Sequence, residues 1–148
     1  MRNPDRPAEA PVIDWKSGEV LPDGAPTIRT TTMPKDANPS GDIFGGWLLA
    51  QMDLAAASLA TRRAQGRCAT VAVEAMSFLS PVLVGDEVSL YTRLVGEGRS
   101  SMRIAVEAWR RRRDSEESVK VTEGLFVLVA IDAERRPRSL PPQPKVKV

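Results

Sequence analysis

Hydrophobic and polar residues follow two different periods along the chain, and the first of them marks one long segment. Residues 43–63 are rich in alanine and leucine, and the polar residues between Trp47 and Ala60 are limited to Gln51, Asp53 and Ser58. A long run of strong helix formers predicts one helix over residues 43–63. Because this segment is apolar on nearly all sides, we expect the helix to be buried and wrapped by other elements.

A period of two residues marks the remaining segments. Apolar alternation or a continuous apolar run predicts strands at residues 69–79, 87–95, 101–109 and 119–131, and a short edge strand precedes the helix at residues 27–33. The run at residues 125–131 is typical of a strand buried on both faces. The order strand, helix and four strands predicts an α+β domain, with one buried helix against a single antiparallel β-sheet.

Proline-rich segments flank this domain on both sides. Residues 1–26 contain five prolines and residues 134–148 contain four, and apolar periodicity is almost absent from both segments. We therefore expect an N-terminal tail over residues 1–26, a domain over residues 27–133 and a C-terminal tail over residues 134–148. The residues of the first tail that are able to attach it to the domain surface are Val12, Ile13 and Trp15.

Composition restricts the chemistry that this chain can perform. Its 148 residues include no histidine and one cysteine, Cys68. Without imidazole, Ser-His-Asp sites, Cys-His sites and histidine-ligated zinc are excluded, and a single cysteine forms neither an internal disulfide nor a thiolate cluster. We expect no metal site, and catalysis is limited to carboxylates, hydroxyls, lysine or backbone groups. The lone cysteine favours a reducing cytoplasm.

Charge and hydropathy give no sign of a nucleic acid or a membrane as a partner. The net charge is +2, and the chain has three Trp, one Tyr and three Phe, which leaves little for base stacking. The N-terminus lacks the apolar core of a signal peptide, and no segment reaches the ~18 apolar residues of a membrane span. We therefore expect a cytoplasmic protein that binds neither nucleic acid nor a membrane.

The densest group of unusual residues comes directly before the helix, in the sequence Asn38-Pro39-Ser40-Gly41-Asp42-Ile43-Phe44-Gly45-Gly46-Trp47. Two glycines at a helix start lower its propensity by roughly 1 kcal/mol each, but they let a ligand approach the backbone closely. The free N–H groups of a first helical turn, at the positive end of the helix dipole, meet the requirement for an oxyanion hole. Asp42 either caps the helix or faces the same site.

Asp53 is a second candidate carboxylate, inside the predicted helix. It follows Gly46 by two helical turns and lies on the same face, among small apolar residues. A carboxylate in these surroundings needs a hydrogen bond, an ion pair or a proton, so Asp53 is either a structural anchor or a functional group. We interpret Glu74, which alternates with apolar neighbours, as an outward residue of a strand.

Together the motifs resemble a known family. They are residues 41–47, Gln51-Met52-Asp53, residues 70–74 with Phe78, Pro81-Val82, Val84-Gly85-Asp86 and, after the last strand, Arg138-Ser139-Leu140-Pro141. In this order and at this spacing they are similar to the bacterial acyl-CoA thioester hydrolases of the hotdog fold, over residues 33–132. The resemblance implies hydrolysis of acyl-CoA to a free acid and coenzyme A, with no cofactor other than the coenzyme A of the substrate.

The same resemblance implies roles for individual residues. Asp42 matches the catalytic carboxylate, and the backbone of Gly45 and Gly46 matches the group that holds the thioester oxygen. Other hotdog thioesterases have their carboxylate at the position of Asp53, which is therefore kept as a second carboxylate that acts from the partner subunit. The candidate substrate-binding residues are Asn38, Phe44, Trp47 and the turn formed by Arg99, Ser100 and Ser101. For that turn, a plain hairpin tip is the alternative.

One sheet covers only one side of an apolar helix, so we expect a dimer or a higher assembly of dimers, such as a trimer of dimers. The alternative functions are a non-catalytic acyl-CoA sensor, a dehydratase or isomerase of the same fold, and a scaffold. The absence of histidine argues against the dehydratase, and the two aspartates argue against the sensor. The basic run at residues 110–113 is followed at once by acidic residues, which indicates a solvated hairpin that neutralises itself.

Overall fold

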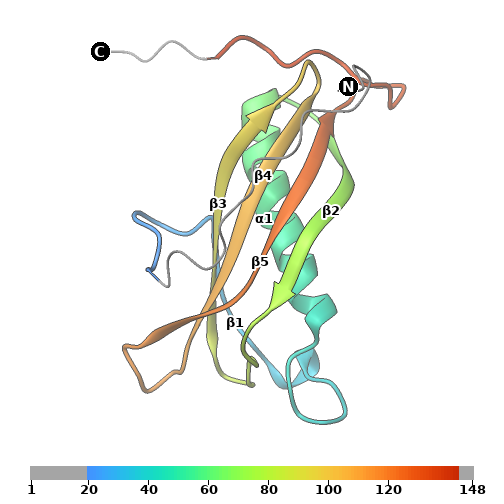
Figure 1. The fold of residues 1–148 in the computed structure, drawn as a ribbon. Helices are drawn as coiled ribbons and strands as arrows, with labels where there is room; N and C mark the ends of the chain where they lie inside the picture. Colours follow the sequence, from blue (N-terminus) through green and yellow to red (C-terminus); the bar gives the residue numbers. More distant parts are fainter. Residues whose placement is uncertain (1–19, 144–148) are drawn as a thin grey trace, which may run out of the picture.

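The computed structural model describes residues 20–143, in which one helix lies against one sheet (Figure 1). The helix is α1 (Gly45–Ala64), and a single turn of 3-10 helix, Pro34–Asp36, precedes it. The strands are β1 (Ile28–Thr31), β2 (Cys68–Phe78), β3 (Glu87–Glu97), β4 (Ser101–Arg111) and β5 (Ser118–Ala130). They form one antiparallel sheet in the order β1-β3-β4-β5-β2. The predicted α+β architecture, with the first strand at an edge, is confirmed.

Helix α1 has two different sides. The side toward the sheet is buried and carries Leu48, Met52, Ala55, Ala56, Ala60 and Ala64. Leu49 and Leu54 of the same helix are exposed apolar residues. Residues 20–143 of one chain therefore cover only part of the helix, and the prediction of a helix covered all round is not met by them.

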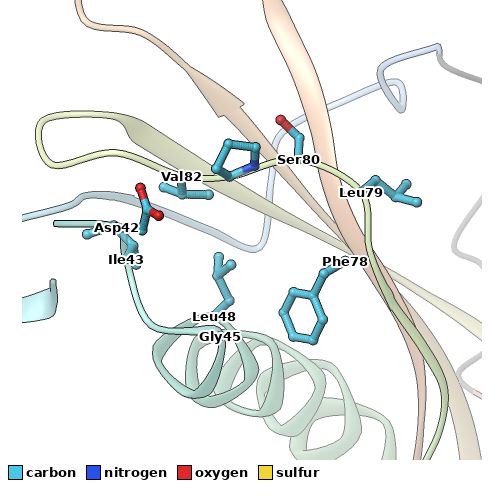
Figure 2. Close-up of a pocket in the computed structure, with 9 residues that line it drawn as sticks. Asp42, Ile43, Gly45, Leu48, Phe78, Leu79, Ser80 and Val82 are labelled. Carbon is cyan, nitrogen blue, oxygen red and sulfur yellow. The ribbon is translucent and has the colours of Figure 1, made fainter. Parts of the chain in front are cut away.

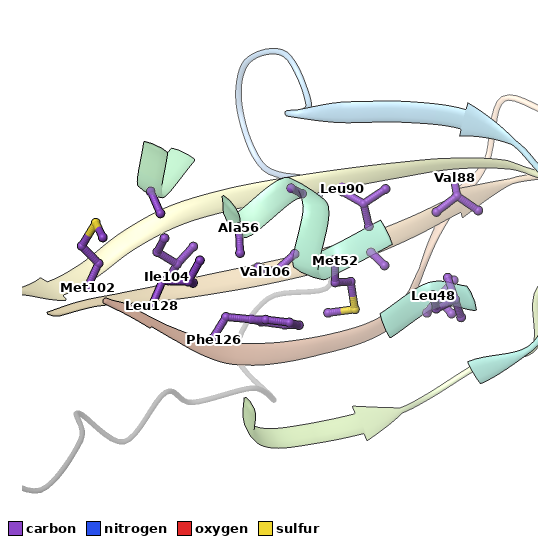
Figure 3. Packing of buried hydrophobic residues seen from close by; sticks show 14 of the residues in the cluster. Leu48, Met52, Ala56, Val88, Leu90, Met102, Ile104, Val106, Phe126 and Leu128 are labelled. Atoms are coloured by element: carbon purple, nitrogen blue, oxygen red, sulfur yellow. The ribbon is translucent and has the colours of Figure 1, made fainter. Parts of the chain in front are cut away.

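The hydrophobic core lies between α1 and the central strands (Figure 3). Phe126, Met52 and Leu90 are the largest side chains that are fully buried there. Burial of each such side chain stabilises the fold by roughly 1.5–3 kcal/mol. The apolar run at residues 125–131 is buried or half-buried throughout, as predicted: Phe126 and Leu128 belong to the core, and the strand neighbour Leu125 is buried as well.

Strand β2 forms the second edge of the sheet and has an irregular backbone. Its register against β5 shifts between Thr70 and Ala72 and again between Glu74 and Ser77. Ala75 has a φ of 51°, in the left-handed region that residues other than glycine rarely adopt. The exposed apolar residues along and just after this strand are Val71, Val73, Phe78 and Leu79. This edge therefore combines unpaired backbone groups with apolar side chains.

Only the end of the N-terminal tail belongs to the described residues. Outside them lie residues 1–19, with the proposed attachment points Val12, Ile13 and Trp15. Residues 20–26 lead to Thr27, whose N–H donates a hydrogen bond of 2.8 Å to the carbonyl of Leu90. The described part of this tail thus continues directly into the edge strand β1, which pairs with β3.

The described part of the expected C-terminal tail is attached to the domain. The N–H of Leu140 donates to the carbonyl of Arg99 (2.8 Å), and Arg63 of α1 donates to the carbonyl of Pro141 (2.7 Å). Leu140 also packs against the core. The chain after residue 133 therefore runs back over the carboxyl-terminal end of the helix.

The basic run at residues 110–113 has acidic partners beyond those that follow it directly in the sequence. Arg112 forms an ion pair with the buried Asp86, and Arg111 forms one with Glu87 (3.4 Å). The reason is the antiparallel pairing of β3 with β4, which sets Glu87 opposite Arg111. The predicted neutralisation by the acids directly after the run is incomplete: the charge of Glu117 acts on Arg110, and sheet pairing brings Asp86 and Glu87 to Arg112 and Arg111.

Candidate active site

A cleft of about 480 Å³ opens at the amino-terminal end of α1 (Figure 2). Its walls come from the segment before the helix, the first turns of the helix and the chain that leads from β2 to β3. The lining residues are Asp42, Ile43, Gly45, Leu48, Phe78, Leu79, Ser80, Pro81 and Val82. The lining is mostly apolar, with a carboxylate and a hydroxyl among it, as is common in sites for small molecules.

Asn38 shapes the loop that leads to the cleft. Its side-chain Oδ1 accepts hydrogen bonds from the N–H groups of Ser40 (2.9 Å) and Asp42 (3.1 Å). Gly41 has a φ of 90°, a conformation that glycine adopts without steric penalty. Ile43 then donates its N–H to the carbonyl of Val82 (2.9 Å). The sequence predicted a substrate contact for Asn38, and the structure gives this residue a local role in which its Oδ1 is fully used.

Asp42 does not cap the helix. The N-cap position belongs to Phe44, which makes no side-chain capping bond. Asp42 lies two residues earlier, is exposed and lines the cleft (Figure 2). Within the described part of the chain its carboxylate has no hydrogen bond or ion pair. The alternative of a capping aspartate is therefore wrong, and the carboxylate is free to face a ligand.

The first turn of α1 leaves two backbone donors unused. The N–H groups of Trp47 and Leu48 donate to the carbonyl of Phe44 (3.1 and 3.2 Å). Those of Gly45 and Gly46 have no acceptor among residues 20–143. A Cβ built on Gly46 meets no atom within 4 Å, so the space beside this residue is open. These donors lie at the positive end of a 20-residue helix, where a developing negative charge is stabilised.

Asp53 is held by a hydroxyl group of the motif at residues 70–74, to which the sequence had assigned no role. Its carboxylate accepts a hydrogen bond of 2.6 Å from Thr70 on β2. The two residues belong to two of the motifs quoted above, but their contact depends on the register of β2 beside the helix and was not predicted. Seven residues separate Asp53 from Gly46, which is about 10 Å along a helix axis. Within one chain, Asp53 is therefore too far to act on a carbonyl bound at Gly46, since a general base works within about 3 Å.

The other predicted substrate-binding residues do not line the cleft of their own chain. Phe44 is exposed at the helix start, and Trp47 is half-buried against the core. Arg99, Ser100 and Ser101 form the β3–β4 turn, beside the carboxyl-terminal end of α1 (Figure 1). A 20-residue helix is about 30 Å long, so one chain does not bring this turn to Gly46.

A buried ionic group lies on the sheet face that points away from α1. Lys120 contacts Glu107 (2.8 Å) and pairs with Glu123, which is almost fully buried. Burial raises the pKa of Glu123, and its bond to Lys120 opposes this rise. For Lys120, burial favours the neutral amine, but the hydrogen bonds to both carboxylates outweigh it and the pKa is raised above its usual value. The sheet lies between these three side chains and the cleft, so we interpret them as a structural group.

Two further kinds of site were sought within residues 20–143. No group of three or more cysteine, aspartate and glutamate side chains there is arranged to hold a metal ion. No helix in the same range is long and apolar enough to cross a membrane.

A single long helix on a five-stranded antiparallel sheet, with a cleft at the helix start, defines a hotdog-fold protein. The profile of the thioesterase superfamily matches residues 40–116. The acyl-CoA thioester hydrolase YciA of Escherichia coli is 49% identical over 124 residues, which cover 82% of this chain and 94% of that protein. This chain belongs to the thioesterase superfamily, and the resemblance seen in its sequence is confirmed.

Solved structures agree in fold. The hexameric thioesterase of Yersinia pestis is 46% identical with a TM-score of 0.79, covering 83% of this chain and 100% of that one. A hexameric broad-specificity acyl-coenzyme A thioesterase is 44% identical with a TM-score of 0.78, covering 84% of this chain and 86% of that one. An aspartate-to-alanine mutant of the latter enzyme is also among the similar structures.

Proposed function

We propose that this protein hydrolyses acyl-CoA thioesters to a free acid and coenzyme A. The observation that carries the proposal is the cleft at the start of α1, which Gly45, a carboxylate and an apolar wall line; the N–H groups of Gly45 and of the adjacent Gly46 have no acceptor among residues 20–143. The names of the close relatives and of the solved neighbours support the same substrate class. The reaction uses water and needs no cofactor beyond the coenzyme A of the substrate.

The two glycines stabilise the transition state in this mechanism. The thioester oxygen lies against the N–H groups of Gly45 and Gly46, and water attacks the carbonyl carbon. The oxygen then becomes an anion that the two donors and the helix dipole stabilise, and loss of one such donor typically costs ~2.7–4 kcal/mol of transition-state stabilisation. The carbon–sulfur bond breaks next, and a thiol with a pKa of about 8.5 leaves as a thiolate without prior protonation. A histidine acid is therefore not required.

Two aspartates are candidates for the base that takes a proton from the water. Asp42 lines the cleft of the same chain, but no group among residues 20–143 holds its carboxylate. Asp53 is oriented by Thr70 at 2.6 Å, and orientation is what an efficient general base needs. Since Asp53 lies two turns from its own Gly46, it serves a thioester bound by another chain. We favour this shared site, and catalysis by Asp42 within one chain is the second candidate.

The exposed apolar surface supports assembly of this kind. Val71 and Val73 are exposed on the edge strand β2, and Leu49 and Leu54 are exposed on α1. An apolar edge strand invites pairing with another chain. Antiparallel pairing of two β2 strands extends the sheet and sets the two α1 helices side by side in opposite directions. The solved neighbours are hexamers, so we infer a dimer or a higher assembly of such dimers.

The same arrangement offers contacts for the rest of the substrate. Reversal of the partner chain brings its β3–β4 turn, with Arg99, to the end of the sheet where Gly46 lies. Arg99 and the adjacent hydroxyls of Ser100 and Ser101 are then available to coenzyme A phosphates, which bind cations and hydroxyl donors. Phe44 and Trp47, which flank the two glycines, are the remaining candidates for contact with the substrate.

A direct assay tests the proposed reaction. The wild-type chain is incubated with a series of straight-chain acyl-CoA thioesters, and the release of free thiol is followed with a thiol reagent. We expect turnover for at least part of the series. Tight binding of acyl-CoA without any thiol release would instead favour the non-catalytic sensor.

A further inference from the structure

The ring of Phe78 forms one wall of the cleft beside the two glycines. A Cβ built on Gly45 would lie 3.3 Å from Cζ and 3.4 Å from Cε1 of this ring. Figure 2 shows the ring beside Gly45 and Leu48, between the helix and the chain that leaves β2. The side chain is nevertheless 57% exposed. A large apolar side chain that is exposed at a cleft is typical of a ligand contact.

The backbone of β2 is altered in a way that directs this ring toward the helix. Glu74 pairs with Leu125 and points away from α1, whereas Phe78 pairs with Thr122 and faces α1. In a regular strand, residues four positions apart share a face. Between Glu74 and Ser77 the strand contains one extra residue, and Ala75 adopts a φ of 51°. A one-residue slip turns the following side chains to the other face, and such bulges occur beside active sites.

We propose that Phe78 determines which acyl chains the enzyme accepts. This inference rests on the proposed function, because it takes the thioester oxygen to lie at Gly45 and Gly46. Beyond that point the cleft is lined by apolar residues that suit an alkyl chain better than the amide-rich arm of coenzyme A, namely Ile43, Leu48, Leu79, Pro81 and Val82. The ring limits the room for this chain next to the first turn of α1.

The test compares Phe78→Ala with the wild type on straight-chain acyl-CoAs from acetyl to dodecanoyl. We expect the ratio of kcat/KM for long chains to that for short chains to rise by at least ~10-fold, because one methylene group in an apolar pocket changes kcat/KM by about 10–200-fold. Val84→Ala is the control, since Val84 is an exposed apolar residue of the chain that leads from β2 to β3, does not line the cleft and lies outside the proposed contact between β2 strands. Its ratio should remain that of the wild type. An unchanged ratio in Phe78→Ala of native oligomeric state would overturn the proposal.

A milder variant guards the test against a folding defect, and a binding measurement makes it independent of the hydrolysis reaction. Phe78→Leu retains an apolar side chain at the edge strand and should shift the chain preference in the same direction by a smaller factor. Calorimetric binding of non-hydrolysable S-alkyl-CoA thioethers of increasing length reports the same preference without turnover. If the wild type releases no thiol but Phe78→Ala binds longer thioethers preferentially, hydrolysis is refuted and the role of Phe78 stands. If thioether preference is equal in all variants, the role of Phe78 is refuted.

Discussion

Individual residues at the start of α1 define what the cleft can do. Gly46 has open space at its Cβ position, Asp42 lines the cleft with a carboxylate that has no partner within residues 20–143, and Asp53 presents a carboxylate that Thr70 holds in place. Each feature is a property of one residue and its immediate hydrogen bonds. Their separate contributions can therefore be measured by single substitutions that alter one group and leave its neighbours unchanged.

Gly46→Pro tests the backbone donor. Proline lacks an N–H but is tolerated in the first turn of a helix, and no atom lies within 4 Å of the position that its Cβ would occupy. We expect kcat to fall by about 10²–10³-fold, the usual effect of losing one oxyanion donor. Gly46→Ala keeps the N–H and should stay close to wild type. The kcat values of both variants are measured by steady-state kinetics, and circular dichroism checks that both are folded. Equal kcat values for the two variants would exclude a role for this N–H.

Asp53→Asn and Asp42→Asn separate the two candidate bases. Asparagine at position 53 can still accept the hydrogen bond from Thr70, so the fold is preserved while the basic group is lost. We expect kcat of Asp53→Asn to fall by at least ~10²-fold, as is typical when a general base is removed. Asp42→Asn should retain most of the wild-type kcat. If the two variants show the opposite order, the reaction takes place within one chain with Asp42 as the base.

At the scale of elements, residue propensities and apolar patterns were sufficient to predict the helix and all five strands in their correct order. This worked because α1 buries a continuous side and β3, β4 and β5 each alternate against the same core. The bond between Thr70 and Asp53 was not predictable, since it depends on how β2 lies beside the helix. The ion pair between Arg112 and Asp86 was missed for a similar reason, because contacts that arise from strand pairing carry no local sequence signal.

The buried ionic group links β4 to β5 and gives the fold a dependence on pH. The pKa of Lys120 is raised in the folded chain, so its contribution to stability is fully present below the ordinary lysine pKa of about 10.4 and is lost as the pH rises through the higher folded value. We expect the Tm to decrease in this alkaline range. Lys120→Met should be less stable by roughly 3 kcal/mol at neutral pH, since it leaves Glu123 buried without its partner.

Thermal unfolding at a series of pH values, with Lys35→Met as the control, checks this prediction. Lys35 is exposed, and a surface substitution of this kind changes stability by no more than about 0.5 kcal/mol. The control should therefore show the same alkaline decrease as the wild type, whereas Lys120→Met should show a smaller one. An identical alkaline decrease in all three proteins would assign it to other groups.

At the scale of the whole molecule, the proposed site needs two chains. Apolar residues of the edge strand β2 and of α1 are exposed among residues 20–143, and Asp53 lies about two helical turns from the glycines of the same chain. Sequence analysis anticipated the need for a partner from the apolar helix alone. It did not reveal which carboxylate each chain contributes, because that depends on distances along the folded helix.

Mixing two inactive variants tests the shared site most directly. Asp53→Asn and Gly46→Pro chains are prepared separately, then unfolded and refolded together, and thiol release from acyl-CoA is compared with that of each variant refolded alone. In a mixed dimer, one site combines the intact Asp53 of one chain with the intact Gly46 of the other. We predict that activity returns to about a quarter of the wild-type value, because half of randomly paired dimers are mixed and each has one intact site of two. If the mixture is no more active than the separate variants, the site does not combine Asp53 and Gly46 from different chains.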